Sequence, residues 1–483
     1  MQTSTARAAN VNLSRRAFLR QAGAALGAVA GLRVAEALAQ SIPGSAPASG
    51  KQRHNVLFLP IDDLNTHLGC YGNKVVQTPN IDKLAAQGVR FTRAYAPYAS
   101  CLPSRASFMS GWYPERTEVL DFSPKARDGK MKDVVYLGQH FRDNGCFTAR
   151  LDKVFHIGAD DALSWDVTEE PIRDQKPMWT GMEVEALGLK DRVLKDGRYD
   201  KVKGEKGPYT MLDVEDEVLF DGMKTARAIE LLEQSAKDGK PFFLACGYRR
   251  PHLPWIAPRK YFGLYPPEKI VLPPPNPNDT ERVPEADHRE MIAHYYACIT
   301  YMDAQVGRLL DALDRLKLRD RTIVVLFGDN GYCLGERGMH FGKGNLWERS
   351  LWVPLIVSMP GAARNSRTCE RSVGLIDLYP TLVELCGLPQ PKSGLQGRSL
   401  APFLSGDSPT WKDQTISVHP LAKGSLGRSV RTDRYRYSED GSGTPLELID
   451  YDADPYECKN LANDPQYAEL RAKLRAILHE DRR

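Results

Sequence analysis

The sequence predicts an α/β protein with a mostly parallel sheet covered by helices on both faces, followed by a smaller C-terminal α+β domain. Continuous apolar runs, such as 55–61 and 322–327, have the length and composition of strands buried on both faces. These runs alternate with helical stretches, which is the pattern of a helix-covered parallel sheet. From about Thr415 the runs become short and are separated by turns. We therefore expect a main domain over 54–414 and a small domain over 415–483.

Composition and charge exclude several classes of protein. The chain has 483 residues, of which 42% are hydrophobic and 26% charged, so a disordered, collagenous or disulfide-scaffold chain is excluded. The length exceeds the roughly 250–300 residues at which a single core stops growing, which favours a large domain plus a smaller one. The net charge is +4, but residues 1–39 hold five Arg and one Glu, so the remainder is neutral. No nucleic-acid partner is expected.

The N-terminal segment has the features of an export signal. A twin-arginine motif, Ser14-Arg15-Arg16-Ala17-Phe18-Leu19, precedes an apolar run over 22–32 and a small-residue site at Ala37-Leu38-Ala39. The run is shorter than the roughly 18 apolar residues of a spanning helix, so no membrane anchor is expected. We interpret 1–39 as a removable twin-arginine signal and 40–53 as a linker. The expected partner is the twin-arginine translocase, and the protein is expected to be exported to the periplasm or secreted.

Periodicity and stop signals predict the individual elements. Gly88 and Gly145 each end a helical stretch, and a glycine at that position is typical of a helix C-terminus. The expected helices are 81–87, 134–144, 215–236, 290–316 and 466–478. The expected strands or extended segments are 55–61, 89–91, 147–151, 241–246, 322–327, 353–359, 427–437 and 446–451.

Polar residues capable of chemistry cluster just after separate strands. They are Asp62-Asp63 after 55–61, Lys153 and His156 after 147–151, His252 after 241–246, and Asp329-Asn330 after 322–327. Ligands bind at the carboxyl ends of the strands in open α/β sheets. We therefore expect these side chains to form one site.

Two pairs of adjacent residues in this set suggest a metal site. Asp62-Asp63 and Asp329-Asn330 offer hard oxygen ligands, which suit Ca²⁺ or Mg²⁺ better than a thiophilic metal. Adjacent carboxylates repel each other unless a cation lies between them. A lone Asp-Asp pair is otherwise a turn or a helix cap, but here the second pair also ends a strand.

Cys101-Leu102-Pro103-Ser104-Arg105 begins a segment that becomes helical and ends at Gly111. A group at this position faces the free N–H groups of a helix start, which bind tetrahedral oxyanions, and Arg105 adds a charged donor. Most single cysteines are buried, inert thiols, and Cys246 and Cys298 fit that description. The nine cysteines form no CxxC pair, and the sequence assigns no disulfide.

These motifs resemble the type I sulfatases of the alkaline-phosphatase-like superfamily, whose Cys-x-Pro-Ser-Arg signature marks a cysteine that is oxidised to formylglycine. The resemblance covers nearly all of 54–475 and is nearest to iduronate-2-sulfatase-like members. It rests on Asp62-Asp63-Leu64, Leu68-Gly69-Cys70-Tyr71-Gly72, Thr78-Pro79-Asn80-Ile81-Asp82, Lys153-Val154-Phe155-His156, Gly247-Tyr248-Arg249-Arg250-Pro251-His252-Leu253-Pro254 and Tyr301-Met302-Asp303-Ala304-Gln305-Val306-Gly307-Arg308-Leu309-Leu310.

The resemblance implies an alkaline-phosphatase-like fold, sulfate ester hydrolysis and a role for each site residue. The implied Ca²⁺ ligands, with Mg²⁺ as the alternative ion, are Asp62, Asp63, modified Cys101, Asp329 and Asn330. Arg105 and Lys153 would hold the modified side chain and the sulfate, His156 would regenerate the aldehyde as a base, and His252 and Lys343 would contact sulfate and assist the leaving group. The implied partners are a sulfated sugar and a formylglycine-generating enzyme, with a glycan 2-O-sulfate as the expected substrate.

Two positions depart from the family pattern. Close iduronate-type relatives have Asp-His where this chain has Asp329-Asn330, which weakens the assignment to iduronate. Asp152 replaces the usual Gly before Lys153, and this change could shift the loop that carries His156.

Alternatives remain at this point. They are a phosphate or phosphonate ester hydrolase of the same superfamily, a sulfatase for choline or aryl sulfate, and a non-catalytic metal-binding protein in which Cys101 stays a thiol. The segment Arg431-Thr432-Asp433-Arg434-Tyr435-Arg436-Tyr437 is interpreted as an ordinary edge strand, although its arginines could reach a carboxylated sugar. His340 has no assigned role, and the loops over 158–210 are expected to select the sugar.

Overall fold

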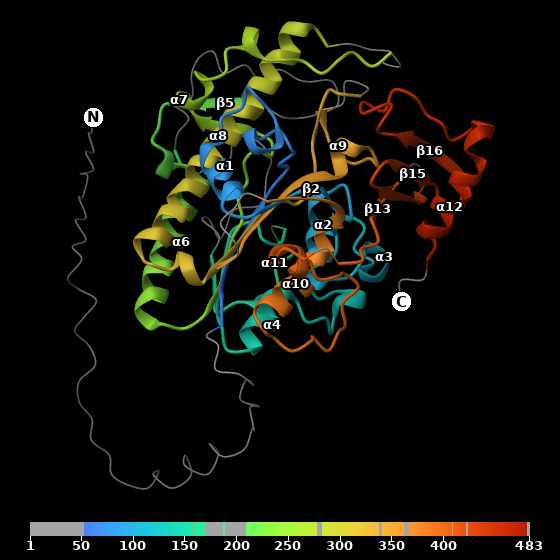
Figure 1. The fold of residues 1–483 in the computed structure, drawn as a ribbon. Helices are drawn as coiled ribbons and strands as arrows, with labels where there is room; N and C mark the ends of the chain where they lie inside the picture. The colour runs from blue at the N-terminus through green and yellow to red at the C-terminus, as the bar shows by residue number, and fades with distance from the viewer. Residues whose placement is uncertain are drawn as a thin grey trace, which may run out of the picture. The chain divides into compact units, whose positions relative to one another are not determined.

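The computed structural model contains an eight-stranded sheet with the order β12-β2-β11-β8-β1-β6-β3-β4 (Figure 1). One strand, β11, runs antiparallel to both of its neighbours, and the other pairings in this sheet are parallel. The predicted mostly parallel α/β sheet is confirmed. The strands of this sheet are β1 (Asn55–Ile61), β2 (Val89–Tyr95), β3 (Phe147–Leu151), β4 (Val167–Glu169), β6 (Phe242–Cys246), β8 (Thr322–Gly328), β11 (Trp352–Ser358) and β12 (Arg367–Gly374).

The structure describes residues 53–156, 158–169, 187–188, 209–277, 283–337, 341–361, 367–407, 409–421 and 424–480. The predicted export signal, residues 40–52 of the linker, His340 and most of the 158–210 region lie outside these residues. Residues Arg53–Arg483 form one compact unit, so the boundary placed at 414/415 marks a change of architecture within that unit and stays a prediction.

Helices cover both faces of the sheet. Alternate side chains of the central strand β1 therefore point into one helical layer or the other. Leu57 and Leu59 are buried in a cluster with residues of α1, α6 and α8, and Val56 and Phe58 in a cluster with residues of α2, α4 and α10 (Figure 1). The helices are α1 (Pro79–Ala86), α2 (Cys101–Ser110), α3 (Pro114–Thr117), α4 (Leu137–Asp143), α6 (Phe220–Asp238), α7 (Arg259–Phe262), α8 (Glu285–Arg315), α9 (Glu348–Leu351), α10 (Leu378–Leu385), α11 (Ala401–Ser405) and α12 (Ala468–Leu478).

The order of the central strands positions the site. Strands β8, β1, β6 and β3 are adjacent and parallel, so the residues that follow them meet at one sheet edge. Ile61 at the end of β1 is opposite Gly328 at the end of β8. This register places Asp62 beside Asp329, although 266 residues separate them in the chain.

The C-terminal region forms a separate antiparallel sheet with the order β13-β14-β15-β16, on which α12 packs (Figure 1). The predicted single strand over 427–437 is wrong, because two strands joined by a turn occupy it. Thr432 Oγ1 accepts the Tyr435 N–H at 3.0 Å and closes this turn. Both strands lie inside the sheet, so the predicted edge position is also wrong. The strands are β13 (Gln414–Pro420), β14 (Leu426–Thr432), β15 (Tyr435–Glu439) and β16 (Pro445–Asp450). Two two-stranded sheets, β5 (Tyr209–Leu212) with β7 (Trp255–Pro258) and β9 (Cys333–Leu334) with β10 (Phe341–Gly342), complete the described strands.

The arginines of this segment pair with acids of the protein. Arg431 binds Glu348 through Nε at 3.0 Å, Arg434 binds Asp450 at 2.6 Å, and Arg436 binds Glu447 at 2.8 Å. Burial raises the pKa of Glu348, but Arg431 outweighs this effect and lowers the pKa below its ordinary value. The pairs therefore support a structural role for these arginines, as the strand interpretation expects.

Arg431→Met should lower the free energy of unfolding by about 3 kcal/mol, because it leaves the Glu348 carboxylate buried without its cation. Urea denaturation measures this change. The matched control is Arg371→Met, which removes an exposed partner of Asp413 and should lower the same quantity by less than about 1 kcal/mol. Equal effects of the two variants would contradict a role for the buried pair in holding β14 to α9.

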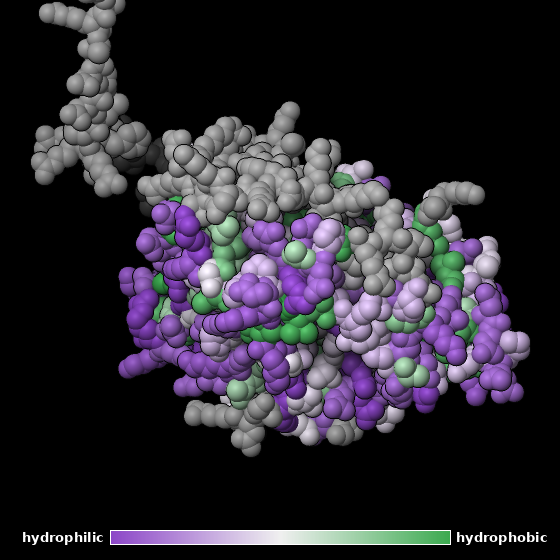
Figure 2. All heavy atoms as spheres, turned by 90° about the horizontal axis from the view of Figure 1, so that it is seen from above, coloured by the Kyte–Doolittle hydropathy of each residue, from purple (hydrophilic) through white to green (hydrophobic). Residues whose placement is uncertain are grey.

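The face shown in Figure 2 is mostly hydrophilic, with small hydrophobic areas between polar ones. The large hydrophobic side chains that are exposed among the described residues are Phe122, Leu163, Met223, Leu264 and Val271. Within the described ranges, no helix has both the length and the apolar character needed to cross a membrane.

Candidate active site

Three buried aspartates form the floor of the site at the ends of β1 and β8. Asp62, Asp63 and Asp329 are at most 1% exposed. The Asp63 and Asn330 N–H groups donate to Asp329 Oδ1 at 3.0 and 2.9 Å, and Asn330 Nδ2 donates to Asp63 Oδ1 at 2.7 Å. Asp63, Asp329 and Asn330, which were predicted from two separate strands, therefore lie in direct contact, and Asp62 precedes Asp63 in the chain.

Cys101 is the first residue of α2 and faces these acids. Its Sγ lies 3.2 Å from Asp62 Oδ1 and 2.7 Å from Lys343 Nζ, and the residue is 1% exposed. Burial, together with the Asp62 charge, raises the pKa of the Cys101 thiol far above its ordinary value. An unmodified Cys101 is therefore a protonated thiol and a poor nucleophile.

Arg105, one turn along α2, is fully buried and holds two parts of the site together. Its Nε donates to Asp329 Oδ2 at 2.8 Å, and its Nη2 lies 3.5 Å from Asp62 Oδ1. Its Nη1 donates to the backbone oxygens of Lys153 and, at 3.1 Å, Val154. The guanidinium therefore fixes both acids relative to the loop that follows β3.

Two lysines supply cationic groups around Cys101. Lys153 Nζ contacts Asp62 Oδ2 and lies 3.8 Å from Cys101 Sγ. Lys343 Nζ contacts Asp63 Oδ1 and lies 3.4 Å from Asn330 Oδ1. Burial lowers the pKa of Lys343, but Asp63 and the other nearby anions outweigh this effect and raise it well above the ordinary value. Lys343 is therefore charged.

Burial and the nearby cations shift the pKa values of the three aspartates in opposite directions. Burial raises the pKa of Asp62, yet Lys153 and the other nearby cations hold it well below its ordinary value. Burial raises the pKa of Asp329 to about 6, with Arg105 opposing this shift. The pKa of Asp63 is raised by burial and by Asp62 despite Lys343.

His252 faces the two adjacent aspartates from the loop after β6. Its Nε2 lies 3.9 Å from Asp62 Oδ2 and 3.7 Å from Asp63 Oδ2, and Nδ1 contacts the Leu253 carbonyl oxygen. Burial lowers the pKa of His252 well below its ordinary value, although Asp62 opposes this shift. A neutral ring that donates from Nδ1 to the carbonyl presents Nε2 to the acids.

His156 lies three residues beyond Lys153. It is half-buried, and its ring meets that of Phe122 edge-on with 5.1 Å between the ring centroids. Its role as the base stays a prediction.

The donor set fits a divalent cation. Ligand atoms of Asp62, Asp63, Cys101 and His252 all lie within 4.8 Å of one another, and the four residues are buried. Lys343 Nζ touches Asp63, Asn330 and Cys101 at once, so these donors converge on one cationic group. Carboxylate and amide oxygens are the ligands that Ca²⁺ and Mg²⁺ prefer.

The C-terminal sheet touches the segments before Cys101 and after Lys343. The Val418 N–H donates to the Pro97 carbonyl at 3.0 Å, and the ring of His419 meets that of Tyr98 edge-on. His419 Nε2 lies 3.6 Å from the position that a Cβ on Gly344 would occupy. The sequence did not predict these contacts of His419, because no local pattern links a strand of the small domain to the segments before Cys101 and after Lys343.

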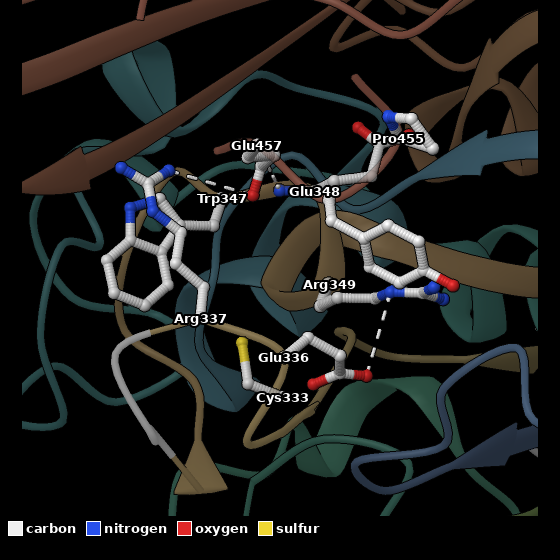
Figure 3. Close-up of a pocket in the computed structure, with 9 residues that line it drawn as sticks. Cys333, Glu336, Arg337, Trp347, Glu348, Arg349, Pro455 and Glu457 are labelled. Carbon is white, nitrogen blue, oxygen red and sulfur yellow. Dashed lines mark hydrogen bonds and ion pairs between the residues drawn. The ribbon is translucent and has the colours of Figure 1, made fainter. Parts of the chain in front are cut away.

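A separate pocket lies where the 333–349 segment meets residues 455–457 (Figure 3). Its charged groups pair across the pocket: Arg349 lies 3.6 Å from Glu336, and Arg337 lies 3.7 Å from Glu457. Cys333 lines this pocket, and burial raises the pKa of its thiol far above the ordinary value. Because its charged side chains pair with one another, we interpret this pocket as a structural contact that holds residues 455–457 of the C-terminal region.

A family model described as Sulfatase matches residues 54–388. The chain belongs to the sulfatase family. The predicted resemblance is thereby confirmed, and this sulfatase is a sulfuric ester hydrolase. A second model, described as N-sulphoglucosamine sulphohydrolase, C-terminal, matches residues 335–483.

Named relatives of this sulfatase cover most of its length. A sulfatase of Formosa agariphila is 31% identical over 88% of this chain and 86% of its own. The iduronate 2-sulfatase of Mus musculus is 29% identical over 87% of this chain and 93% of its own. The crystal structure of the phosphonate monoester hydrolase of Agrobacterium radiobacter has the same fold, with a TM-score of 0.71, 24% identity, and coverage of 88% of this chain and 95% of that one.

Proposed function

We propose that this sulfatase removes sulfate from a glycan, with a 2-O-sulfated sugar as substrate, through a formylglycine made from Cys101 and a bound Ca²⁺. The observation that carries the proposal is the position of Cys101 at the start of α2, with Sγ 2.7 Å from Lys343 Nζ and 3.2 Å from Asp62. The sugar assignment rests on the similarity to iduronate 2-sulfatase.

The charges of the site favour an anionic substrate once a metal is bound. The carboxylates of Asp62, Asp63 and Asp329 balance the cations of Arg105, Lys153 and Lys343. Any added divalent cation leaves the site positive, and a positive buried site attracts a sulfate ester. When bound, Ca²⁺ would polarise the sulfate oxygens and favour the ionised form of a neighbouring hydroxyl. Asp62, Asp63, Asp329 and Asn330 would hold the ion, with the modified Cys101 completing the set.

The thiol itself is unsuited to this reaction, because its raised pKa keeps it protonated. As a hydrated aldehyde, the side chain at position 101 would offer one hydroxyl to attack sulfur and a second whose deprotonation releases sulfate. Lys153 and Lys343 would stabilise negative charge at this position, and Arg105 would hold the acids and the Lys153 backbone in place. His156 would take the proton of the second hydroxyl, and His252 and Lys343 would assist the departing alcohol.

We also propose that the modification precedes folding and export. Every residue of α2 is buried, so a modifying enzyme has no access to Cys101 in the folded protein. The proposed twin-arginine route carries folded proteins, which places the action of a formylglycine-generating enzyme in the cytoplasm and the mature protein in the periplasm.

A panel of defined sulfated oligosaccharides, with choline sulfate, 4-nitrophenyl sulfate and 4-nitrophenyl phosphate, tests the substrate class. Release of 2-O-sulfate is expected to be the fastest, and kcat/KM should be about tenfold or more higher for the aryl sulfate than for the aryl phosphate. The main alternative is a phosphate or phosphonate ester hydrolase, and faster cleavage of the phosphate would favour it. Turnover of choline sulfate or aryl sulfate without desulfation of any sugar would instead contradict the glycan assignment.

A further inference from the structure

Asp152 occupies a backbone position that ordinarily favours glycine. Its φ is +53°, in the left-handed region, and its carbonyl oxygen accepts the Val154 N–H at 2.8 Å, which closes a tight turn after β3. Side chains with a Cβ are strained in this region, although Asp tolerates it better than most residues. Strain of this kind persists where the surrounding structure compensates for it.

The compensation comes from two basic side chains that bind the Asp152 carboxylate. Arg249 donates to it through Nε at 2.7 Å and through Nη2 at 3.0 Å, and Lys224 Nζ from α6 also contacts it. The side chain of Asp152 is fully buried, and that of Lys224 is 3% exposed. A buried carboxylate with a two-point arginine contact is a geometrically specific link.

The arginine end of this link belongs to the loop that carries His252. Asp221 of α6 accepts the backbone N–H groups of Arg249 and Arg250, each at 3.0 Å, and Lys224 lies 3.3 Å from Asp221. The His252 N–H donates to the Arg249 carbonyl at 2.8 Å. Asp221 and Lys224 therefore anchor the Arg249–His252 segment to α6.

The other end of the link lies in the loop after β3, where Lys153 follows Asp152 directly in the chain. Lys153 contacts Asp62 and approaches Cys101, while its backbone oxygen accepts from Arg105. The two loops also touch directly, since a Cβ on Gly247 would lie 2.3 Å from the Lys153 oxygen. A change at Asp152 therefore acts on a lysine that contacts Asp62 and lies 3.8 Å from Cys101 Sγ.

We propose that Asp152, held by Lys224 and Arg249, is a positioning residue that fixes Lys153 and His252 relative to each other. The proposal rests on the proposed function, because it assigns both loops to the site that cleaves the sulfate ester. Asp152 itself does not touch the reacting groups; it acts through the two loops that do.

The test compares wild type with Asp152→Gly, Arg249→Met and the double variant, using 4-nitrophenyl sulfate and protein with equal formylglycine content by mass spectrometry. Glycine accepts the left-handed backbone, so Asp152→Gly removes the carboxylate without adding strain. Each single variant should lower kcat by about tenfold or more and change KM by less than about threefold. The double variant should fall no further than the worse single variant, because both remove the same link.

Two further variants separate positioning from general stability. Asp450→Asn breaks a two-point pair with Arg434 in the C-terminal sheet, and its kcat should stay within about twofold of wild type. Asp152→Asn with Lys224→Met removes the carboxylate together with the buried amine that contacts it, so it serves if Asp152→Gly does not fold, and it should show the same loss of kcat.

Hydrogen–deuterium exchange gives a readout independent of turnover. Asp152→Gly should speed exchange both in peptides covering 150–156 and in peptides covering 247–254. Exchange that rises only in 150–156, or a kcat within about twofold of wild type, would overturn the proposal. Wild-type protein that carries formylglycine and Ca²⁺ yet cleaves no sulfate ester would contradict the proposed function, and the exchange result would still decide the positioning proposal.

Discussion

Cys101→Ala is expected to lower kcat for sulfate ester hydrolysis by a factor on the order of 10⁴ or more, because it removes the group from which the nucleophile is made. The melting temperature should stay close to that of wild type, since the substitution changes only the end of one short side chain and leaves the helix intact. Initial rates with 4-nitrophenyl sulfate and thermal melting measure the two quantities.

Cys101→Ser is the matched control for this variant. Serine keeps a group of similar size and restores a hydroxyl, but it offers no second hydroxyl to release sulfate, so turnover should still be lost. Retained activity in either variant would show that another nucleophile operates. Mass spectrometry of the wild-type peptide adds an independent check, because an unmodified thiol in active protein from the native host would exclude formylglycine catalysis.

Asp329→Ala is expected to lose bound Ca²⁺ and most of the activity. The substitution removes a predicted metal ligand, and it also removes the acceptor that Arg105 Nε, the Asp63 N–H and the Asn330 N–H share. Metal analysis of purified protein should find about one ion per chain in wild type and none in the variant. A chelator should inactivate the wild type, and added Ca²⁺ should restore it.

Asp329→Asn separates the two effects of this substitution. Asparagine keeps the size of the side chain and one acceptor oxygen for the backbone donors, but it lacks the charge. It should bind Ca²⁺ more weakly than wild type while its melting temperature changes less than that of Asp329→Ala. A full complement of metal in the alanine variant would show that Asp329 is not a ligand.

Much of the fold could be predicted because local patterns report burial. The runs ending at Ile61 and Gly328 contain almost only apolar residues, as strands covered on both faces require. A polar pair directly after such a run must lie at the sheet edge, so Asp62-Asp63 and Asp329-Asn330 could be assigned to one site. The helix that begins at Cys101 could also be predicted, because Pro103 suits its first turn and Gly111 its end.

Pairings between distant segments could not be predicted, because no local signal encodes them. The segment 427–437 was predicted as one strand, yet it forms β14 and β15, which pair with each other, and β14 also pairs with β13. The direction of β11 could not be predicted either. Its residues are mostly apolar, so they would be buried equally well whether the strand ran parallel or antiparallel to β2 and β8.

The sequence by itself determined the kind of chemistry, since the residues that follow the strands and the string around Cys101 identify a sulfatase and predict a cation site beside an oxyanion site. The tertiary structure decided how those groups are held. Asp152 departs from the family pattern in the sequence, but only the folded chain shows its positive φ and its carboxylate between Lys224 and Arg249. The physical reason is that burial and turn preferences are properties of neighbouring residues, whereas a buried ion pair exists only where separate segments meet.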